Sequence, residues 1–292
     1  MTPEMKFSIV IPVYNRASQV KHAIDSVLNQ SYHNFEVIVV DDGSTDSTKQ
    51  VVKSITDKRI TYLYQENRER GAARNTGTHH ASGNFVTYLD SDDEFLSDHL
   101  LKVAEYISSN PGFDVYCTAY EKVSESKIER IHIPENIATQ LVNGNFLSCN
   151  GVFITKETCS QFQFNEDRIM AGLEDWELWL RIGSAKKMKA AQLFTSRMNH
   201  HTNRSVLLTE RHEIEERFKW FFHAVKSNAS TSLFYKNSLR QLESSGETYM
   251  ALHLAMTKKY RSSAFGHLWK GFTLSPSIVF TKRFYAILKR IL

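Results

Sequence analysis

An Asp-x-Asp triplet directly follows an apolar stretch of the sequence, residues 85–89. Its two carboxylates, Asp90 and Asp92, are separated by Ser91. Two carboxylates at this spacing can direct oxygen atoms toward one cation that also binds phosphate oxygens, and such hard ligands suit Mg²⁺ or Mn²⁺. The ordinary alternative is a simple turn, because Asp often caps a helix or bonds its own backbone.

A second acidic cluster favours the metal and nucleotide interpretation. Asp41 and Asp42 follow the apolar run 35–40, and Gly43 lets the backbone bend tightly after them. Since both clusters end predicted parallel strands, we expect them to meet at the carboxyl edge of one sheet, where open α/β sheets bind ligands. An Asp here can accept a hydrogen bond from a uracil ring or a ribose hydroxyl, or it can cap the next helix.

Other positions near these clusters are candidates for contacts with a nucleotide. Tyr14, two residues after Pro12, ends the first predicted strand, where its ring can stack on a base. Arg74 lies in the small-residue run 71–77, which opens a helix, and can pair with a diphosphate. Pro12 and Ser91 complete the predicted set. Ordinary packing of Tyr14 and a surface position for Arg74 are the structural alternatives.

A carboxylate from a separate segment can act as a general base. Asp175 follows Glu174 at the start of an apolar-rich helix. A base that deprotonates an attacking hydroxyl must lie across the anomeric carbon from a leaving diphosphate, so it should not come from the metal-binding turn. The alternative is that both acids simply suit a helix amino terminus.

Two adjacent histidines open the polar run 200–205. Either His200 or His201 can complete a metal site or contact phosphate. An exposed loop histidine without a role is the alternative.

Apolar patterning indicates which elements position these residues. Residues 6–12 and 35–40 read as buried parallel strands, and apolar residues at three- and four-residue spacing between them predict a helix. Strand and helix continue to alternate, which is typical of a mostly parallel α/β sheet flanked by helices. The further elements expected are helices at 44–55, from 71, at 100–107 and at 172–182, and strands at 60–64, 85–89 and 113–120.

The pattern changes along the chain and predicts two parts. With 292 residues the chain can bury a large core. Residues 1–205 are expected to form the α/β domain, with a nucleotide-binding half at 1–97 and an acceptor-side half at 98–205. Residues 206–292 are expected to form a helical C-terminal region.

Six ordered segments resemble the inverting glycosyltransferases of family 2, which have the GT-A fold and use nucleotide-diphosphate sugars. The resemblance covers residues 6 to about 205. The segments are SIVIPVYNR, QSYHNFEVIVVDDGSTD, GAARNTG, YLDSDDEF, GLEDWELWLR and HHTNRS.

The resemblance implies a role for each candidate residue. Tyr14 and Asp42 would hold the base, Arg74 would support the nucleotide, and Asp175 would be the catalytic base. Asp90 and Asp92 would form the metal motif, with Asp92 as the direct ligand. His200 fits the family pattern H-x-x-N-x-S and would face the metal or diphosphate. The family often has an Arg two residues before this His, whereas Arg197 stands three before it, so His201 stays an alternative.

Cysteine content and hydropathy indicate the cellular compartment in which the protein is located. Cys117, Cys149 and Cys159 form no Cys-x-x-Cys pair and are odd in number, which favours a reducing compartment. We expect neither a signal peptide nor a membrane-spanning helix, because the amino terminus lacks a basic, apolar leader and no long apolar run occurs. A cytoplasmic location follows.

Positive charge is concentrated at the carboxyl end. The formal net charge is +4, yet eight Lys or Arg residues and no acid follow Glu247. A helix predicted after Ser275 and Pro276 places apolar residues on one side and cations on the other. The apolar set is Phe280, Phe284, Ile287, Leu288 and Ile291, and the cationic set is Lys282, Arg283, Lys289 and Arg290.

This basic helix has three possible roles. It can lie on an anionic membrane surface, dock on the rest of the chain with its cations in water, or bind a protein partner. Nucleic acid is not predicted, because no recognised binding motif accompanies the charge.

The sequence as a whole predicts a metal-dependent hexosyltransferase. It would move a sugar from a nucleotide-diphosphate sugar, most simply a UDP-sugar, to a saccharide or lipid-linked acceptor at the cytoplasmic membrane face, in surface polysaccharide synthesis. A nucleotide-sugar-binding subunit without turnover is the alternative. A dinucleotide-dependent oxidoreductase is disfavoured, because no G-x-G-x-x-G follows the first strand.

Overall fold

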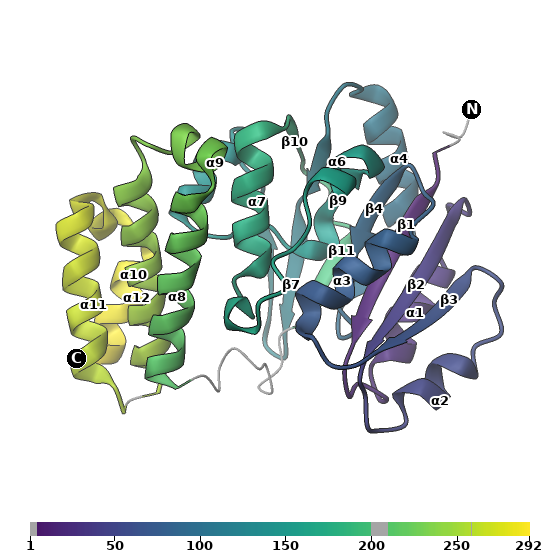
Figure 1. Cartoon of the computed structure of the whole chain (residues 1–292), viewed down its shortest axis with the longest axis horizontal. Coiled ribbons are helices and arrows are strands. Elements are labelled where there is room, and N and C mark those ends of the chain that lie inside the picture. Colours follow the sequence, from purple (N-terminus) through teal and green to yellow (C-terminus); the bar gives the residue numbers. More distant parts are fainter. Residues whose placement is uncertain (1–4, 200–209, 258) are drawn as a thin grey trace. The chain divides into compact units, whose positions relative to one another are not determined.

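A computed structural model describes residues 5–199, 210–257 and 259–292. These residues divide into two compact units (Figure 1). The first comprises 5–137, 146–178 and 186–199, and the second comprises 138–145, 179–185 and the described residues from 210 onward. The predicted boundary near residue 205 falls among the undescribed residues 200–209 and stays a prediction.

The first unit is built on a seven-stranded sheet of order β10-β6-β9-β4-β1-β2-β3. Neighbouring strands are parallel except at β9, which pairs antiparallel with β4 and with β6. The predicted mostly parallel α/β sheet is therefore confirmed. The strands are β1 (Phe7–Val13), β2 (Phe35–Asp42), β3 (Ile60–Gln65), β4 (Phe85–Tyr88), β6 (Val115–Thr118), β9 (Val152–Thr155) and β10 (Met188–Ala191).

Helices cover both faces of this sheet because its central strands are apolar on both sides. All seven residues of β1 are buried. Alternate β1 residues from Phe7 to Val13 pack in one core with α1 and α4, whereas Val10 faces α3 on the other side. A Cβ at Gly77 of α3 would come within 2.3 Å of Val10 Cγ1, so only glycine allows this close approach.

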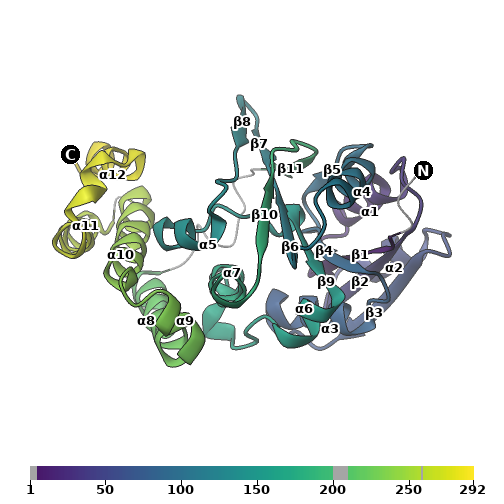
Figure 2. The same ribbon diagram turned by 90° about the horizontal axis from the view of Figure 1, so that it is seen from above.

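Figure 2 shows α1 and α4 on one face of the sheet and α3 and α6 on the other. The helices of this unit are α1 (Val20–Leu28), α2 (Thr48–Lys53), α3 (Glu69–His80), α4 (His99–Ser109) and α6 (Lys156–Gln161), together with the first turn of α7 (Glu174–Ala185).

A smaller sheet of order β5-β11-β7-β8 belongs to the same unit. Strand β11 pairs parallel with β7 and antiparallel with β5, the strand that directly follows the Asp-x-Asp turn. The strand expected over 113–120 is in fact divided between the two sheets, as β6 and β7. The four strands are β5 (Glu94–Phe95), β7 (Tyr120–Ser124), β8 (Lys127–Ile131) and β11 (Ser196–Asn199).

The second unit is helical, as predicted for the C-terminal region. Helix α10 packs against α8, α11 and α12. No helix among the described residues is long and apolar enough to cross a membrane. The helices are α5 (Ile137–Gln140), α8 (Arg211–Ser227), α9 (Ala229–Phe234), α10 (Leu239–Met256), α11 (Arg261–Leu274) and α12 (Lys282–Ile291).

The carboxyl-terminal helix differs in two respects from the sequence prediction. Pro276–Phe280 is a short 3-10 turn, and α12 begins afresh at Lys282 because Thr281 is extended and its side chain accepts a hydrogen bond from the Phe284 N–H. Arg283 does not share a solvent face with the other cations, since it donates to Ser245 O at 3.1 Å on α10. Its guanidinium finds acceptors on α10 that periodicity cannot reveal.

Candidate active site

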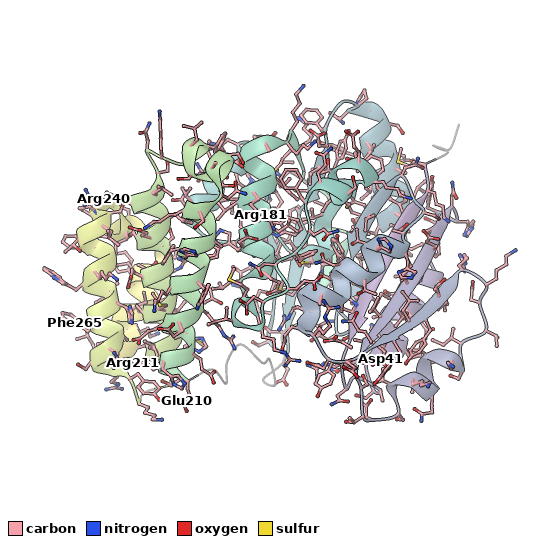
Figure 3. The ribbon with its side chains drawn as sticks, viewed as in Figure 1. Asp41, Arg181, Glu210, Arg211, Arg240 and Phe265 are labelled. Atoms are coloured by element: carbon pink, nitrogen blue, oxygen red, sulfur yellow. The ribbon has the colours of Figure 1, made fainter. Side chains whose placement is uncertain are left out.

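The acidic clusters lie at one edge of the main sheet. β1 is hydrogen-bonded between β2 and β4, and all three strands run in the same direction. Val13 pairs with Asp41, and Val10 pairs with Tyr88, two residues before Asp90. Figure 3 shows Asp41 at this carboxyl edge. Both acidic clusters thus follow strands that end at the same edge of the sheet, which is where parallel α/β sheets bind ligands.

Asp41 shapes the turn that follows β2. Its carboxylate is buried and accepts hydrogen bonds from the Ser44 N–H at 2.9 Å and the Tyr62 hydroxyl at 2.7 Å. Burial raises the pKa of Tyr62, and the neighbouring carboxylate raises it further. Both Asp41 oxygens thus have protein partners, which indicates that this side chain supports the edge.

Asp42 is held by the segment that leads into α3. Its Oδ1 accepts hydrogen bonds from Gln65 Nε2 at 2.6 Å and from the Arg68 N–H at 2.9 Å. Burial raises the pKa of this carboxyl group, and these hydrogen bonds oppose the rise. The carboxylate is therefore fixed in orientation at the sheet edge.

The loop after β1 leaves an aromatic ring exposed at the same edge. Tyr14 is 48% exposed, although it adjoins a fully buried strand. The next residue, Asn15, has a left-handed backbone (φ 50°), and its Oδ1 accepts a hydrogen bond from the Thr45 N–H at 2.8 Å. Its own N–H donates to Ser44 Oγ at 2.9 Å. Asn15 thus ties the two loops together; sequence reasoning overlooked it, although Asn tolerates this conformation better than most residues.

Arg74 joins the Asp-x-Asp turn to the start of α7. Its guanidinium donates through Nη2 to Asp90 Oδ1 at 2.7 Å and through Nη1 to Glu174 Oε1 at 3.0 Å. The side chain is only 2% exposed and lies over the Phe164 ring. The surface alternative for Arg74 is therefore wrong. The predicted contact with a nucleotide stays a prediction.

Asp175 follows directly on this ion-paired cluster. Asp175 as a residue is partly exposed, and its carboxylate accepts a hydrogen bond from the Trp176 N–H at 2.7 Å. Burial raises its pKa to about 6, and the charge of Glu174 adds to the rise, while Arg74 and Arg70 oppose it. A carboxyl group with this pKa is ionised at neutral pH yet basic enough to take up a proton.

Glu174 positions the amino end of α7. It is buried, and its Oε2 accepts a hydrogen bond from the Gly172 N–H at 2.6 Å while Oε1 binds Arg74. Gly172 itself has a φ of 90°, which glycine adopts readily. The two adjacent acids therefore differ: the Glu174 carboxylate is engaged in structural contacts, whereas Asp175 is a partly exposed residue.

The residues at this edge fit a divalent cation in part. Asp90 keeps a side chain that is 37% exposed, and Asp92 is also partly exposed. Two carboxylates suit Mg²⁺ or Mn²⁺, which commonly complete their coordination with phosphate and water. Across the described residues, no group of three or more His, Cys, Asp or Glu is arranged to hold a metal. His200 and His201 lie outside the described residues.

Comparison with known proteins identifies the family. Residues 8–165 match the family model described as glycosyl transferase family 2. The chain belongs to that family.

Two relatives illustrate the similarity within family 2. An uncharacterized glycosyltransferase of Rickettsia felis is 35% identical over 187 residues, which make up 62% of this chain and 31% of that protein. The UDP-Glc:alpha-D-GlcNAc-diphosphoundecaprenol beta-1,3-glucosyltransferase WfgD of Escherichia coli is 33% identical over 179 residues, 60% of this chain and 68% of WfgD. The chain thus spans about a third of the Rickettsia relatives that it matches.

Solved structures share the fold of this family 2 chain. TarS of S. aureus (residues 1–349, with UDP-GlcNAc) has a TM-score of 0.63 at 17% identity over 94% of this chain and 92% of its own. The mannosyltransferase PcManGT from Pyrobaculum calidifontis, with GDP-Man and Mn²⁺, has a TM-score of 0.63 at 18% identity over 99% and 86%. The predicted GT-A fold of family 2 is therefore confirmed.

Proposed function

We propose that this chain is an inverting glycosyltransferase that moves a sugar from a nucleotide-diphosphate sugar, a UDP-sugar in the first instance, to an acceptor hydroxyl. The observation that carries the proposal is the Arg74 bridge. Because one guanidinium binds both Asp90 and Glu174, the Asp-x-Asp turn and Asp175 belong to one cluster at the carboxyl edge of the sheet.

The donor nucleotide would bind at the ends of β1 and β2. The exposed ring of Tyr14 would stack on the base, and the fixed carboxylate of Asp42 would accept a hydrogen bond from the base or ribose. Pro12, Asp41 and Ser91 would shape the walls of this site. The name of WfgD, which includes UDP-Glc, supports a uridine donor.

Asp92 and Asp90 would hold Mn²⁺ or Mg²⁺, with His200 or His201 as a further ligand. Bound there, the cation would supply positive charge to the leaving diphosphate. Arg74 offsets part of the negative charge on Asp90, so Asp92 would be the direct ligand. The Mn²⁺ in PcManGT supports this choice of metal.

Asp175 would act as the general base. Its carboxylate would accept the proton of the acceptor hydroxyl while the hydroxyl oxygen bonds to the anomeric carbon from the face opposite the diphosphate. The bond from that carbon to the diphosphate oxygen breaks in the same step, so the configuration inverts. The raised pKa of Asp175 favours this role, because proton transfer is most efficient when the base titrates near the working pH.

The acceptor would be a lipid-linked saccharide in surface polysaccharide synthesis. The name of WfgD includes a diphosphoundecaprenol-linked sugar, which supports such an acceptor. The end of the chain exposes Phe280 (87%) and Tyr285 (61%), together with Lys282, Lys289 and Arg290. Exposed aromatic and cationic side chains together suit the surface of an anionic membrane, which supports a location at its cytoplasmic face as part of this proposal.

The decisive experiment supplies the purified chain with Mn²⁺ and a panel of nucleotide sugars. We expect NMR to show slow hydrolysis of one donor when no acceptor is present. When a saccharide acceptor is added, we expect transfer with inverted anomeric configuration. Donor binding without any turnover would favour the alternative of a nucleotide-sugar-binding subunit. Absence of binding to every nucleotide sugar would refute both.

A further inference from the structure

Asp93, the acid that follows the Asp-x-Asp triplet, is buried, whereas Asp90 and Asp92 are partly exposed. Asp93 is only 2% exposed, and its Oδ1 accepts a hydrogen bond from the Asn199 N–H at 2.9 Å. Its Oδ2 accepts one from Asn150 Nδ2 at 3.2 Å. Burying a carboxyl group is costly unless hydrogen bonds compensate, so this position is demanding. Its two hydrogen-bond donors come from segments far away in the sequence.

These donors belong to the acceptor-side half of the first unit. Asn150 lies in the short 3-10 turn Cys149–Gly151 and is fully buried. Its amide nitrogen also lies 3.4 Å from the backbone oxygen of Arg197 in β11. Asp93 is therefore connected to the end of β11 both directly and through Asn150.

The connection is reciprocal. Asn199 donates through Nδ2 to the backbone oxygen of Asp92 at 2.9 Å, while its own N–H binds Asp93. The turn itself is closed by a hydrogen bond from the Asp93 N–H to Asp90 O at 3.0 Å. The backbone that carries the Asp92 carboxylate is thus fixed on both sides.

We infer that Asp93 is a positioning residue that locks the Asp-x-Asp turn to the end of β11, so that the donor-side turn and the acceptor-side strand move as one body. The inference rests on the proposed function, since it assigns the turn to donor binding. A displaced turn would misplace the Asp92 carboxylate, and small misplacements of a catalytic group can cost on the order of 100-fold in rate.

A donor–acceptor swap tests the inference in the full-length chain. Asp93→Asn turns an amide NH₂ toward the Asn150 amide, and Asn150→Asp sets two carboxylates against each other. The double variant restores one donor and one acceptor across the pair, while residue 93 keeps an oxygen for the Asn199 N–H. Two measurements are made: UDP affinity in the presence of Mn²⁺ by calorimetry, and hydrogen exchange of peptides covering 88–95 and 194–199.

Each single variant is expected to lower the UDP affinity by about ten-fold or more and to speed exchange in both peptides together. The double variant should recover part of both losses, because the hydrogen bond across the 93–150 pair is restored but residue 150 no longer donates to the backbone oxygen of Arg197. Asn199→Ala removes the hydrogen bond to Asp92 O but keeps the backbone N–H that binds Asp93, and it gives a second variant should Asp93→Asn fail to fold. Asp98→Asn, which alters an exposed carboxylate paired with Lys102, is the matched control and should change neither measurement.

A role confined to fold stability would give a different result. Single variants that lose thermal stability but keep UDP affinity within about two-fold of the parent overturn the inference. A double variant that recovers nothing, or exchange that changes in only one of the two peptides, also overturns it. Absence of UDP binding by the parent chain counts instead against the proposed function, and the exchange results then decide the inference alone.

Discussion

Arg74 and Glu174 form an ion pair in which both side chains are almost completely buried, at 2% and 3% exposure. Removing two charges from water is expensive, and their attraction offsets that cost only when further hydrogen bonds satisfy the remaining polar atoms. Here Asp90 and the Gly172 N–H supply part of that satisfaction. The pair is best explained as a device that holds the Asp-x-Asp turn and the amino end of α7 in register.

Arg74→Ala should therefore destabilise the protein strongly. The substitution removes the guanidinium that is hydrogen-bonded to buried Glu174 and leaves Arg70 Nε at 3.6 Å as a longer contact. Breaking a buried pair typically costs about 3–5 kcal/mol. Chemical denaturation measures the free energy of unfolding. Lys21→Ala, which removes an exposed ion pair with Asp25, should change it by less than about 1 kcal/mol. Equal effects of the two variants would contradict the structural role of Arg74.

Asp175→Asn should abolish transfer while preserving donor binding. The amide cannot accept the proton of the acceptor hydroxyl, and loss of a general base typically costs about 10²- to 10⁴-fold in rate. Steady-state kinetics give the rate, and calorimetry should show UDP affinity within about three-fold of the parent. Asp25→Asn on the exposed face of α1 serves as the control. Near-normal turnover of Asp175→Asn would reject the assignment of the base.

The transfer rate should rise with pH through about 6. Burial raises the pKa of Asp175 to about this value, and only the ionised carboxylate can accept a proton. The contribution of Asp175 to the free energy of unfolding should fall as the pH rises from the ordinary pKa of 3.8 to about 6. In this range the folded protein binds the proton more tightly than the unfolded chain does. Kinetics and unfolding measured over pH 4–8 check both trends. A rate independent of pH across this range would exclude Asp175 as the titrating base.

A histidine in the second unit should make the stability of the helices depend on pH. Burial lowers the pKa of His267, but hydrogen bonds to Glu247 at 2.7 Å and Glu215 at 3.1 Å outweigh this and raise it. Its contribution is fully present below the ordinary value of 6.5 and is lost as the pH rises through the raised pKa.

The two carboxylates act in the opposite sense. Burial opposes ionisation of Glu247 and Glu215, but their hydrogen bonds lower both pKa values, so their contribution is present above 4.5 and fades as the pH falls through the lowered values. Thermal unfolding should show that His267→Gln flattens the decline of stability above pH 6.5. His223→Gln, at an exposed position of α8, should leave the profile unchanged. Identical profiles for His267→Gln and the parent would contradict this account.

Membrane binding should depend on the exposed cations of α12. Each cation near an anionic surface contributes about 1 kcal/mol, so replacing Lys282, Lys289 and Arg290 by Gln should weaken binding to anionic vesicles by about 100-fold. Vesicle sedimentation measures this. The same replacements at Lys219, Lys226 and Lys236, exposed elsewhere in the second unit, are the control. Binding that is equally weakened by both sets would indicate only general charge attraction.

The docked part of α12 explains why Arg283 is left out of that set. Arg283 donates to Ser245 O and Thr248 Oγ1 on α10, and Ile287 is fully buried. The exposed aromatic residues include Phe265 and Trp269 of α11 as well as those at the end of the chain; Figure 3 shows Phe265 projecting outward from its helix. The sequence left docking and membrane contact as alternatives, whereas the structure shows that one side of α12 is docked and another is exposed.

The sequence by itself determined the family, the alternation of strands and helices, and the acidic clusters at the strand ends. These features are local: burial of a parallel strand requires a continuous apolar run, and a turn after the strand carries its acids to the sheet edge. Strand β1, the turn at Asp41 and the triplet beginning at Asp90 could therefore be placed from the residues alone.

Only the tertiary structure decided which partner each of these residues has. Arg74 and Glu174 are 100 positions apart, and Asp93 and Asn199 are separated by 106. Periodicity says nothing about contacts at such distances, because they depend on how the sheet order and connecting loops bring separate segments together. Burial then selects the partners, since a charge or amide removed from water must find a hydrogen bond within the fold.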